Sequence, residues 1–107
     1  MKKFKITVTR TDEYEIEVDE TVWTQETLFK WSNIFQEAES PEDFAKCLAA
    51  SITYYGSDHG IMEGFGNVQI FRHDGTEIIK AGKKTEGLSA KLLVENGDYE
   101  CVAEEIS

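Results

Sequence analysis

Residues 40–56, with the sequence SPEDFAKCLAASITYYG, carry the clearest helix signals in the chain. Ser40 is a favoured N-cap, and Pro41 fits the first helical position, where no amide hydrogen is needed. The two acids that follow suit the positive end of a helix dipole. Apolar residues then recur at helical spacing until Gly56, which can end the helix. The stretch therefore predicts a helix over residues 41–55.

A second helix is predicted directly before it. Thr24 can serve as its N-cap, and Trp23 and Leu28 have the spacing of a hydrophobic staple. We expect this helix to reach Glu39, because the residue before a proline is disfavoured in the α region. Its predicted buried stripe is Leu28, Trp31, Ile34, Phe35 and Ala38. With almost no linker between them, the two helices are expected to form a bent antiparallel pair.

The N-terminal residues 3–19 alternate between apolar and polar side chains, as a β-hairpin does. A turn at residues 10–12 would place all the apolar side chains on one face. It would also place Lys5 opposite Glu17, which is a favourable cross-strand pair. The expected apolar pairs are Val8 with Tyr14, Ile6 with Ile16 and Phe4 with Val18.

Two more hairpins are predicted in the C-terminal half. Strands over 68–72 and 76–81 would turn at Asp74-Gly75 and pair Arg72 with Glu77. Strands over 88–95 and 98–106 would turn at Asn96-Gly97. This last turn would pair Val94 with Tyr99, Leu92 with Cys101 and Ala90 with Ala103.

The predicted order of elements is ββ-αα-ββ-ββ. Short hairpins favour an antiparallel sheet. The expected fold is therefore a single α+β domain over residues 1–107, with two layers: a sheet of about six antiparallel strands and two helices on one face.

The composition describes a folded but strongly acidic domain. Of 107 residues, 21 are Asp or Glu and 11 are Lys or Arg, which gives a formal charge of −10. Such a charge disfavours direct binding to nucleic acid or an anionic membrane, and it favours basic partners. No apolar run approaches the roughly 20 residues of a membrane-spanning helix, and no apolar leader follows the first lysines. We expect a cytoplasmic protein whose Cys47 and Cys101 are free and mostly buried.

The glycine-rich segment 56–66 is the obvious place to look for chemistry. It contains Ser57, Asp58, His59 and Glu63, but it lacks the GK[ST] of a phosphate-binding loop. Adjacent Ser, Asp and His residues have poor geometry for a catalytic relay, and two histidines in the chain are few for a metal site. We expect a connector here, with a partner-binding loop and a ligand site as the alternatives. No enzyme activity, cofactor or metal is predicted.

The predicted helical region is the segment with the largest net negative charge. Residues 21–63 carry a net −5, compared with −2 for residues 1–20 and −3 for residues 64–107. Solubility alone can explain this, but a docking surface for a basic protein can as well. Trp23, Phe29 and Phe65 have no evident place in the apolar stripes, and aromatic side chains dominate interfaces. The predicted partner-binding residues are Glu26, Phe29, Glu37, Glu39, Glu42, Asp43, Asp58, Glu63 and Phe65.

The main hypothesis is therefore a non-enzymatic module that binds a basic partner, with nucleic-acid-binding proteins as the candidate class. In size, acidity and lack of catalytic motifs the chain is similar to small accessory proteins of bacteriophages and mobile elements. Some of those inhibit nucleases by imitating the charge of nucleic acid. One alternative is a homo-oligomerising domain that uses a strand edge or Phe29, so that both a monomer and a dimer remain open. A small enzyme or ligand-binding protein built on the 56–66 loop is the other alternative.

Overall fold

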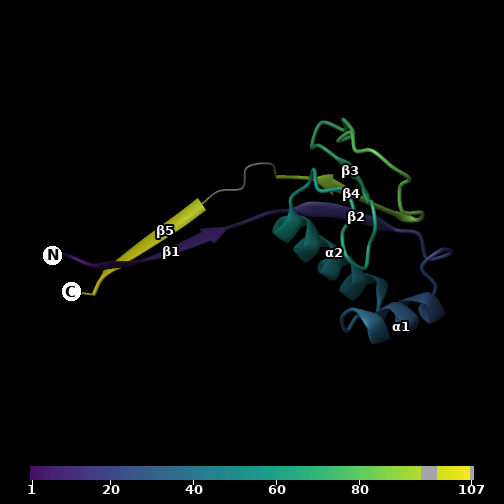
Figure 1. The fold of residues 1–107 in the computed structure, drawn as a ribbon, viewed down its shortest axis with the longest axis horizontal. Coiled ribbons are helices and arrows are strands. Elements are labelled where there is room, and N and C mark those ends of the chain that lie inside the picture. The colour runs from purple at the N-terminus through teal and green to yellow at the C-terminus, as the bar shows by residue number, and fades with distance from the viewer. Residues whose placement is uncertain (95–98, 107) are drawn as a thin grey trace.

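The computed structural model describes residues 1–94 and 99–106 (Figure 1). In this part of the chain, two helices and five strands form an α+β fold with two separate sheets. The elements are β1 (Phe4–Arg10), β2 (Tyr14–Val18), α1 (Gln25–Ile34), α2 (Pro41–Tyr55), β3 (Gln69–Phe71), β4 (Leu88–Leu92) and β5 (Tyr99–Glu105). The α+β class is thus confirmed, and the pairing is antiparallel in part. The expected two layers with a single sheet of about six antiparallel strands are not confirmed, because the described strands fall into two sheets.

Strand β4 is the centre of the three-stranded sheet, whose order is β2-β4-β3. It pairs antiparallel with β2 and parallel with β3. The second sheet consists of β1 and β5 alone, in antiparallel pairing. The expected N-terminal hairpin is wrong, because Val8 pairs with Cys101 and Tyr14 pairs with Leu92. Strands β1 and β2 are instead successive strands that pair with successive parts of the C-terminal segment.

The predicted C-terminal hairpin is also wrong, because β4 and β5 pair with other strands and not with each other. Leu92 and Ala90 lie opposite β2, and Tyr99 lies opposite Arg10. The predicted turn at Asn96-Gly97 falls outside the described residues.

The Asp74-Gly75 turn is present, but it is one residue longer than expected. The amide of Arg72 donates to the carbonyl of Thr76, and Phe71, rather than Arg72, bridges to Glu77. Gly75 has a φ of 90°, as the last position of a three-residue hairpin loop requires. The expected strand over 76–81 is not formed.

The predicted helix caps are confirmed. Thr24 accepts a hydrogen bond from the amide of Thr27, Ser40 accepts one from the amide of Asp43, and Gly56 caps the end of α2. Helix α1 nevertheless ends at Ile34, five residues before the expected end. The chain then turns back, so that Ile34 is exposed and Ala38 is buried.

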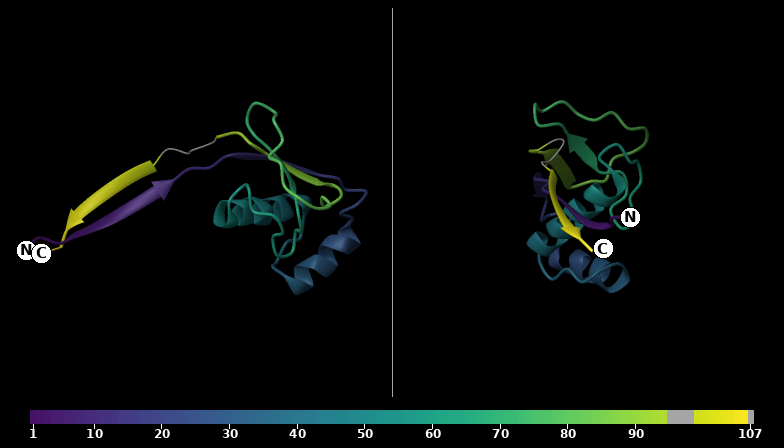
Figure 2. Two further views of the ribbon diagram at one scale, coloured as in Figure 1. Left: turned by 45° about the horizontal axis from the view of Figure 1, so that its top comes forward. Right: turned by 90° about the vertical axis from the view of Figure 1, so that its left-hand side faces the viewer.

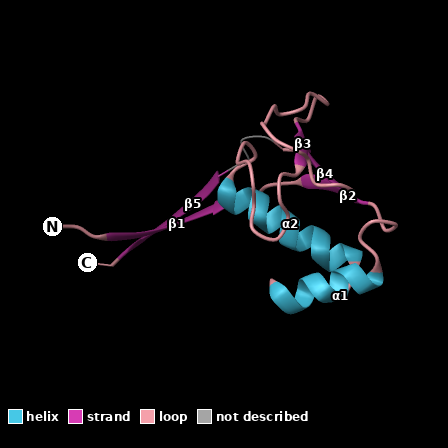
Figure 3. Ribbon diagram, turned by 45° about the vertical axis from the view of Figure 1, so that its right-hand side comes forward, coloured by secondary structure: helices cyan, strands magenta, loops and turns pink. Residues whose placement is uncertain are grey.

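The two helices are not an antiparallel pair. The side-chain amide of Gln25, at the start of α1, donates to the carbonyl of Glu39, immediately before α2, at 3.4 Å. The two helices therefore begin at the same end (Figure 3).

An aromatic cluster forms the centre of the core. Phe44 is fully buried, and its ring centroid lies 4.6 Å from that of Trp23, 4.9 Å from that of Trp31 and 5.3 Å from that of Phe65. Phe65 is thus a core residue and the half-buried Trp23 packs against the core, which the apolar stripes did not reveal. Neither α1 nor α2 has the length and apolar character to cross a membrane, and these are the helices of the described residues.

Strands β1 and β5 form an arm that projects from the rest of the molecule (Figure 2). The molecule extends 58 × 33 × 20 Å, with a radius of gyration of 17.1 Å. A compact chain of this length would have a radius of gyration of about 13 Å. We call residues 4–10 and 99–105 the β1–β5 arm and the rest of the described chain the body.

Candidate functional site

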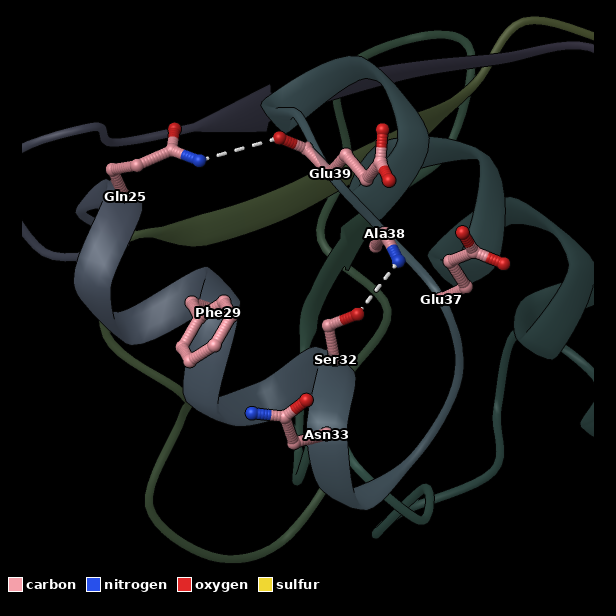
Figure 4. Close-up of a pocket in the computed structure, with 7 residues that line it drawn as sticks. All are labelled: Gln25, Phe29, Ser32, Asn33, Glu37, Ala38 and Glu39. Carbon is pink, nitrogen blue, oxygen red and sulfur yellow. Dashed lines mark hydrogen bonds between the residues drawn. The ribbon is translucent and has the colours of Figure 1, made fainter.

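The segment that returns from the end of α1 encloses a surface depression of about 560 Å³ (Figure 4). Two hydrogen bonds hold this segment against α1. The amide of Ala38 donates to the hydroxyl of Ser32 at 3.0 Å, and the side chain of Gln25 holds Glu39. We call the lining the α1–α2 surface: Gln25, Phe29, Ser32, Asn33, Glu37, Ala38 and Glu39.

Phe29 provides the apolar part of this surface. It follows Gln25 by four residues and precedes Ser32 by three, so the three side chains share one face of α1. The side chain of Phe29 is 65% exposed beside the depression. An exposed aromatic ring next to a concavity is a typical anchor for a protein partner.

Two carboxylates give the α1–α2 surface its charge. Glu37 and Glu39 are both exposed, and neither is in an ion pair with a described residue. The last turn of α1 contains no basic residue, so the negative end of its dipole adds to their field. The surface therefore combines an aromatic anchor with uncompensated negative charge.

The structure brings three of the nine predicted site residues together here: Phe29, Glu37 and Glu39. Gln25, Ser32 and Asn33 complete the lining and were not predicted. Helical spacing from Phe29 identifies Gln25 and Ser32, because i−4 and i+3 positions share its face. Nothing in the sequence signalled that the chain returns along α1.

Three further predicted acids have local partners. Glu26 lies 3.3 Å from Lys30, and Glu42 lies 3.7 Å from Lys46, in exposed pairs along the helices. Such pairs contribute only a few tenths of a kcal/mol but reduce the net charge that a partner meets. Asp43 accepts a hydrogen bond at 3.3 Å from the amide of Glu39, the residue before the N-cap Ser40, while its own amide donates to the Ser40 hydroxyl.

The remaining three predicted residues lie outside the α1–α2 surface. Glu63 lines a separate hollow beside Phe35 and Tyr55. Asp58 lies in the glycine-rich segment, where its charge acts on Lys80. Phe65 is only 2% exposed, so it contributes to the core and not to any surface.

The glycine-rich segment packs into the core through a tight turn. Met62 and Gly66 exchange backbone hydrogen bonds, and Met62 is buried. The indole of Trp31 donates to the carbonyl of Gly64 at 2.7 Å, where a φ of 84° suits glycine. These contacts are those of a structural connector between α2 and β3.

The histidine of this segment stacks on an aromatic neighbour. The rings of His59 and Tyr55 lie 4.7 Å apart at 21°. The amine of Lys80 donates to the carbonyls of His59 and Val68, and burial lowers the pKa of that amine. In the described chain no three His, Cys, Asp or Glu side chains lie close enough together to hold a metal ion.

The two cysteines are free, but they differ in exposure. Cys47 is half-buried in α2, whereas Cys101 is exposed on the β1–β5 arm, so the expectation of two mostly buried thiols is wrong for Cys101. Burial, together with the charge of Asp43, raises the pKa of Cys47.

We expect iodoacetamide to alkylate Cys101 before Cys47, because the thiolate is the reactive form and a raised pKa reduces its fraction. The reaction is run near pH 7.5 at about 1 µM protein, where small interfaces are dissociated, and peptide masses give the order. Cys47 should approach the rate of Cys101 only at higher pH. Equal rates at pH 7.5 would contradict this assignment.

The chain matches no protein-family model, no curated protein and no solved structure. A functional proposal therefore rests on the chemistry of the α1–α2 surface.

Proposed function

We propose that this protein is a non-enzymatic binding module whose α1–α2 surface engages a basic protein partner. The observation that carries the proposal is that exposed Phe29, Glu37 and Glu39 line one depression. The ring supplies apolar contact area, and the carboxylates are free to accept hydrogen bonds from Lys or Arg side chains.

Charge distribution supports a basic partner. Outside the arm, residues 11–98 contain 7 bases and 18 acids, a net −11. A field of this sign steers positively charged proteins toward the body and raises their association rates. Proteins that bind nucleic acid carry such basic surfaces, and they are the partner class that we propose.

The test is capture of basic proteins from lysate of the native host on the immobilised full chain. Retention at about 50 mM salt and release at about 500 mM are expected, because screening shortens the reach of the charges. The double variant Glu37→Lys/Glu39→Lys should reduce recovery of the same protein at least tenfold, which corresponds to about 1.4 kcal/mol.

A matched variant separates the site from net charge. Glu13→Lys/Glu17→Lys makes the same change in charge at exposed positions on and next to β2. Its recovery should stay within about twofold of the wild type, since only long-range steering is altered. Equal losses in both double variants would contradict a localised site, as would full retention by Glu37→Lys/Glu39→Lys.

A second pair of variants tests the aromatic anchor. Phe29→Ala should weaken capture by about tenfold, a loss typical of an interface anchor. Ile79→Ala removes an apolar side chain that is even more exposed, outside the α1–α2 surface, and should leave capture unchanged. If Phe29→Ala also leaves capture unchanged, the α1–α2 surface is not the contact.

A further inference from the structure

The two faces of the β1–β5 arm differ in polarity. Residues directly opposite each other in an antiparallel pair project on the same side. One face carries the pairs Ile6–Ala103 and Val8–Cys101, with Phe4 and Tyr99 at its two ends. The other face carries Lys5–Glu104, Thr7–Val102 and Thr9–Glu100. We call the first the apolar arm face.

No described residue covers the apolar arm face. Phe4, Ile6 and Val8 are 54–56% exposed, and Tyr99 is 64% exposed. On β2 the same even-numbered alternation continues with Tyr14 and its successors, which pack on the core.

Helix α2 accounts for the difference between the two strands. The hydroxyl of Tyr14 lies 2.8 Å from that of Thr53, near the end of α2. The arm continues past this end (Figure 1), so it has the core-facing pattern of β2 without the helix. A two-stranded ribbon with one bare apolar face is marginal in water by itself and gains stability from a cover.

The charge of the arm favours the arm of a second copy as the partner that covers the apolar arm face. Residues 1–10 and 99–107 contain four bases and three acids, a net +1, so two arms do not repel each other as two bodies do. The apolar arm face also has opposite charges at its two ends, with Arg10 at the base and Glu105 at the tip. Arg10 is paired with Asp12 in its own chain, whereas Glu105 is in no ion pair with a described residue.

We propose that two copies of this chain associate through their apolar arm faces, packed tip to base. In this two-fold arrangement each Glu105 comes to the end of the partner arm that carries Arg10, and each Phe4 comes to the end that carries Tyr99. Every contact is made twice, as an isologous interface requires. This interface is separate from the α1–α2 surface, which stays open on both copies.

The size of the interface sets the conditions of the test. Seven residues at about 3.3 Å each, across two strands, give a face of roughly 200 Å². This is below the roughly 800 Å² per partner of a stable complex, so the dimer is concentration-dependent. Light scattering after gel filtration should show the mass rising from 12.2 kDa toward twice that value. The range to scan is roughly 1–200 µM.

Two double variants locate the contact. Ile6→Lys/Val8→Lys places charge on the apolar arm face and should keep the protein monomeric throughout the range. Thr7→Lys/Thr9→Lys adds the same charge to the same strand on the opposite face and should dimerise as the wild type does. Trp23 and Trp31 lie in the body, so their fluorescence verifies that each variant retains a folded body.

Cys101 offers a second measurement on the unmodified chain. It lies on the apolar arm face, so its alkylation should slow several-fold between low and high protein concentration. Cys47 in α2 should react at the same rate at both concentrations. A wild-type mass of 12.2 kDa at all concentrations would overturn the proposal. So would a dimer that survives Ile6→Lys/Val8→Lys, or one that both double variants abolish.

Discussion

Phe44→Ala is expected to lower the free energy of unfolding by about 3–5 kcal/mol, the usual cost of truncating a buried phenylalanine. Phe44 is fully buried against Trp23, Trp31 and Phe65, so its removal leaves a cavity that three large rings cannot easily fill. Urea unfolding followed by far-ultraviolet circular dichroism measures the change. Phe29→Ala removes the same side chain from an exposed position and should cost less than about 0.5 kcal/mol.

The loss at Phe44 can equal the whole stability of a domain of this size, which is often only 5–15 kcal/mol. Phe44→Leu provides a milder variant, which keeps most of the apolar volume and should remain folded. A midpoint for Phe44→Ala that equals that of Phe29→Ala would show that this aromatic cluster does not hold the helices on the sheet.

Gly87→Ala is the second substitution with a large expected effect, about 2–3 kcal/mol. Gly87 has a φ of 73°, a region that costs an L-residue about 1–2 kcal/mol. A Cβ there would also lie 2.8 Å from the Cβ of Val22, and the carbonyl of Gly87 accepts a hydrogen bond from the amide of Asp19. The added methyl therefore forces apart the connection between β2 and α1 and the start of β4.

Two other glycines separate the cost of backbone strain from the cost of the steric clash. Gly75 has a φ of 90° but open space around it, so Gly75→Ala should show the backbone cost alone. Gly60→Ala meets neither strain nor atoms and should be close to neutral. In a domain of this size, a loss of 1 kcal/mol lowers the melting temperature by about 4–8 °C. Thermal unfolding therefore distinguishes the three glycine variants. Equal melting temperatures for Gly75→Ala and Gly87→Ala would contradict the clash with Val22.

Local sequence signals were sufficient to predict where the two helices start. Caps at Thr24 and Ser40 and the stop at Gly56 depend on neighbours within four residues, and all three are confirmed. The end of α1 was not predictable in this way. Pro41 marks a position that the helix cannot pass, but it does not say how far before it the helix stops.

The prediction of strand partners was wrong, because an alternating pattern shows which side chains share a face of the sheet but not which strand lies next to it. In a hairpin or in two successive strands, the even-numbered residues from Phe4 to Val18 lie on one side in both cases. The charge criterion did not distinguish them either, since Lys5 has an acid opposite it in both arrangements: Glu17 as predicted and Glu104 as observed. Long-range pairing depends on the whole sheet and is not encoded in a single segment.

The candidate site was predictable only in part. Phe29 falls off the apolar stripe of α1, which marks it as a candidate contact residue, and its side chain is exposed. Phe65 lies in the core and not on the predicted surface, because the turn that carries it inward depends on hydrogen bonds among Met62, Gly66 and their neighbours. A run of glycines indicates that a chain can turn, but it does not give the direction of the turn.

The antiparallel pairing of β1 with β5 also determines how the molecule carries mechanical load. Both ends of the described chain lie at the tip of the arm (Figure 1), where Phe4 is opposite Glu105. Tension between these ends acts across the ladder and opens it pair by pair from the tip, whereas shearing would load every hydrogen bond at once. The force reaches the three-stranded sheet only after the last pair, Arg10 and Tyr99, has separated. Under such tension the β1–β5 arm therefore separates before the body bears any load.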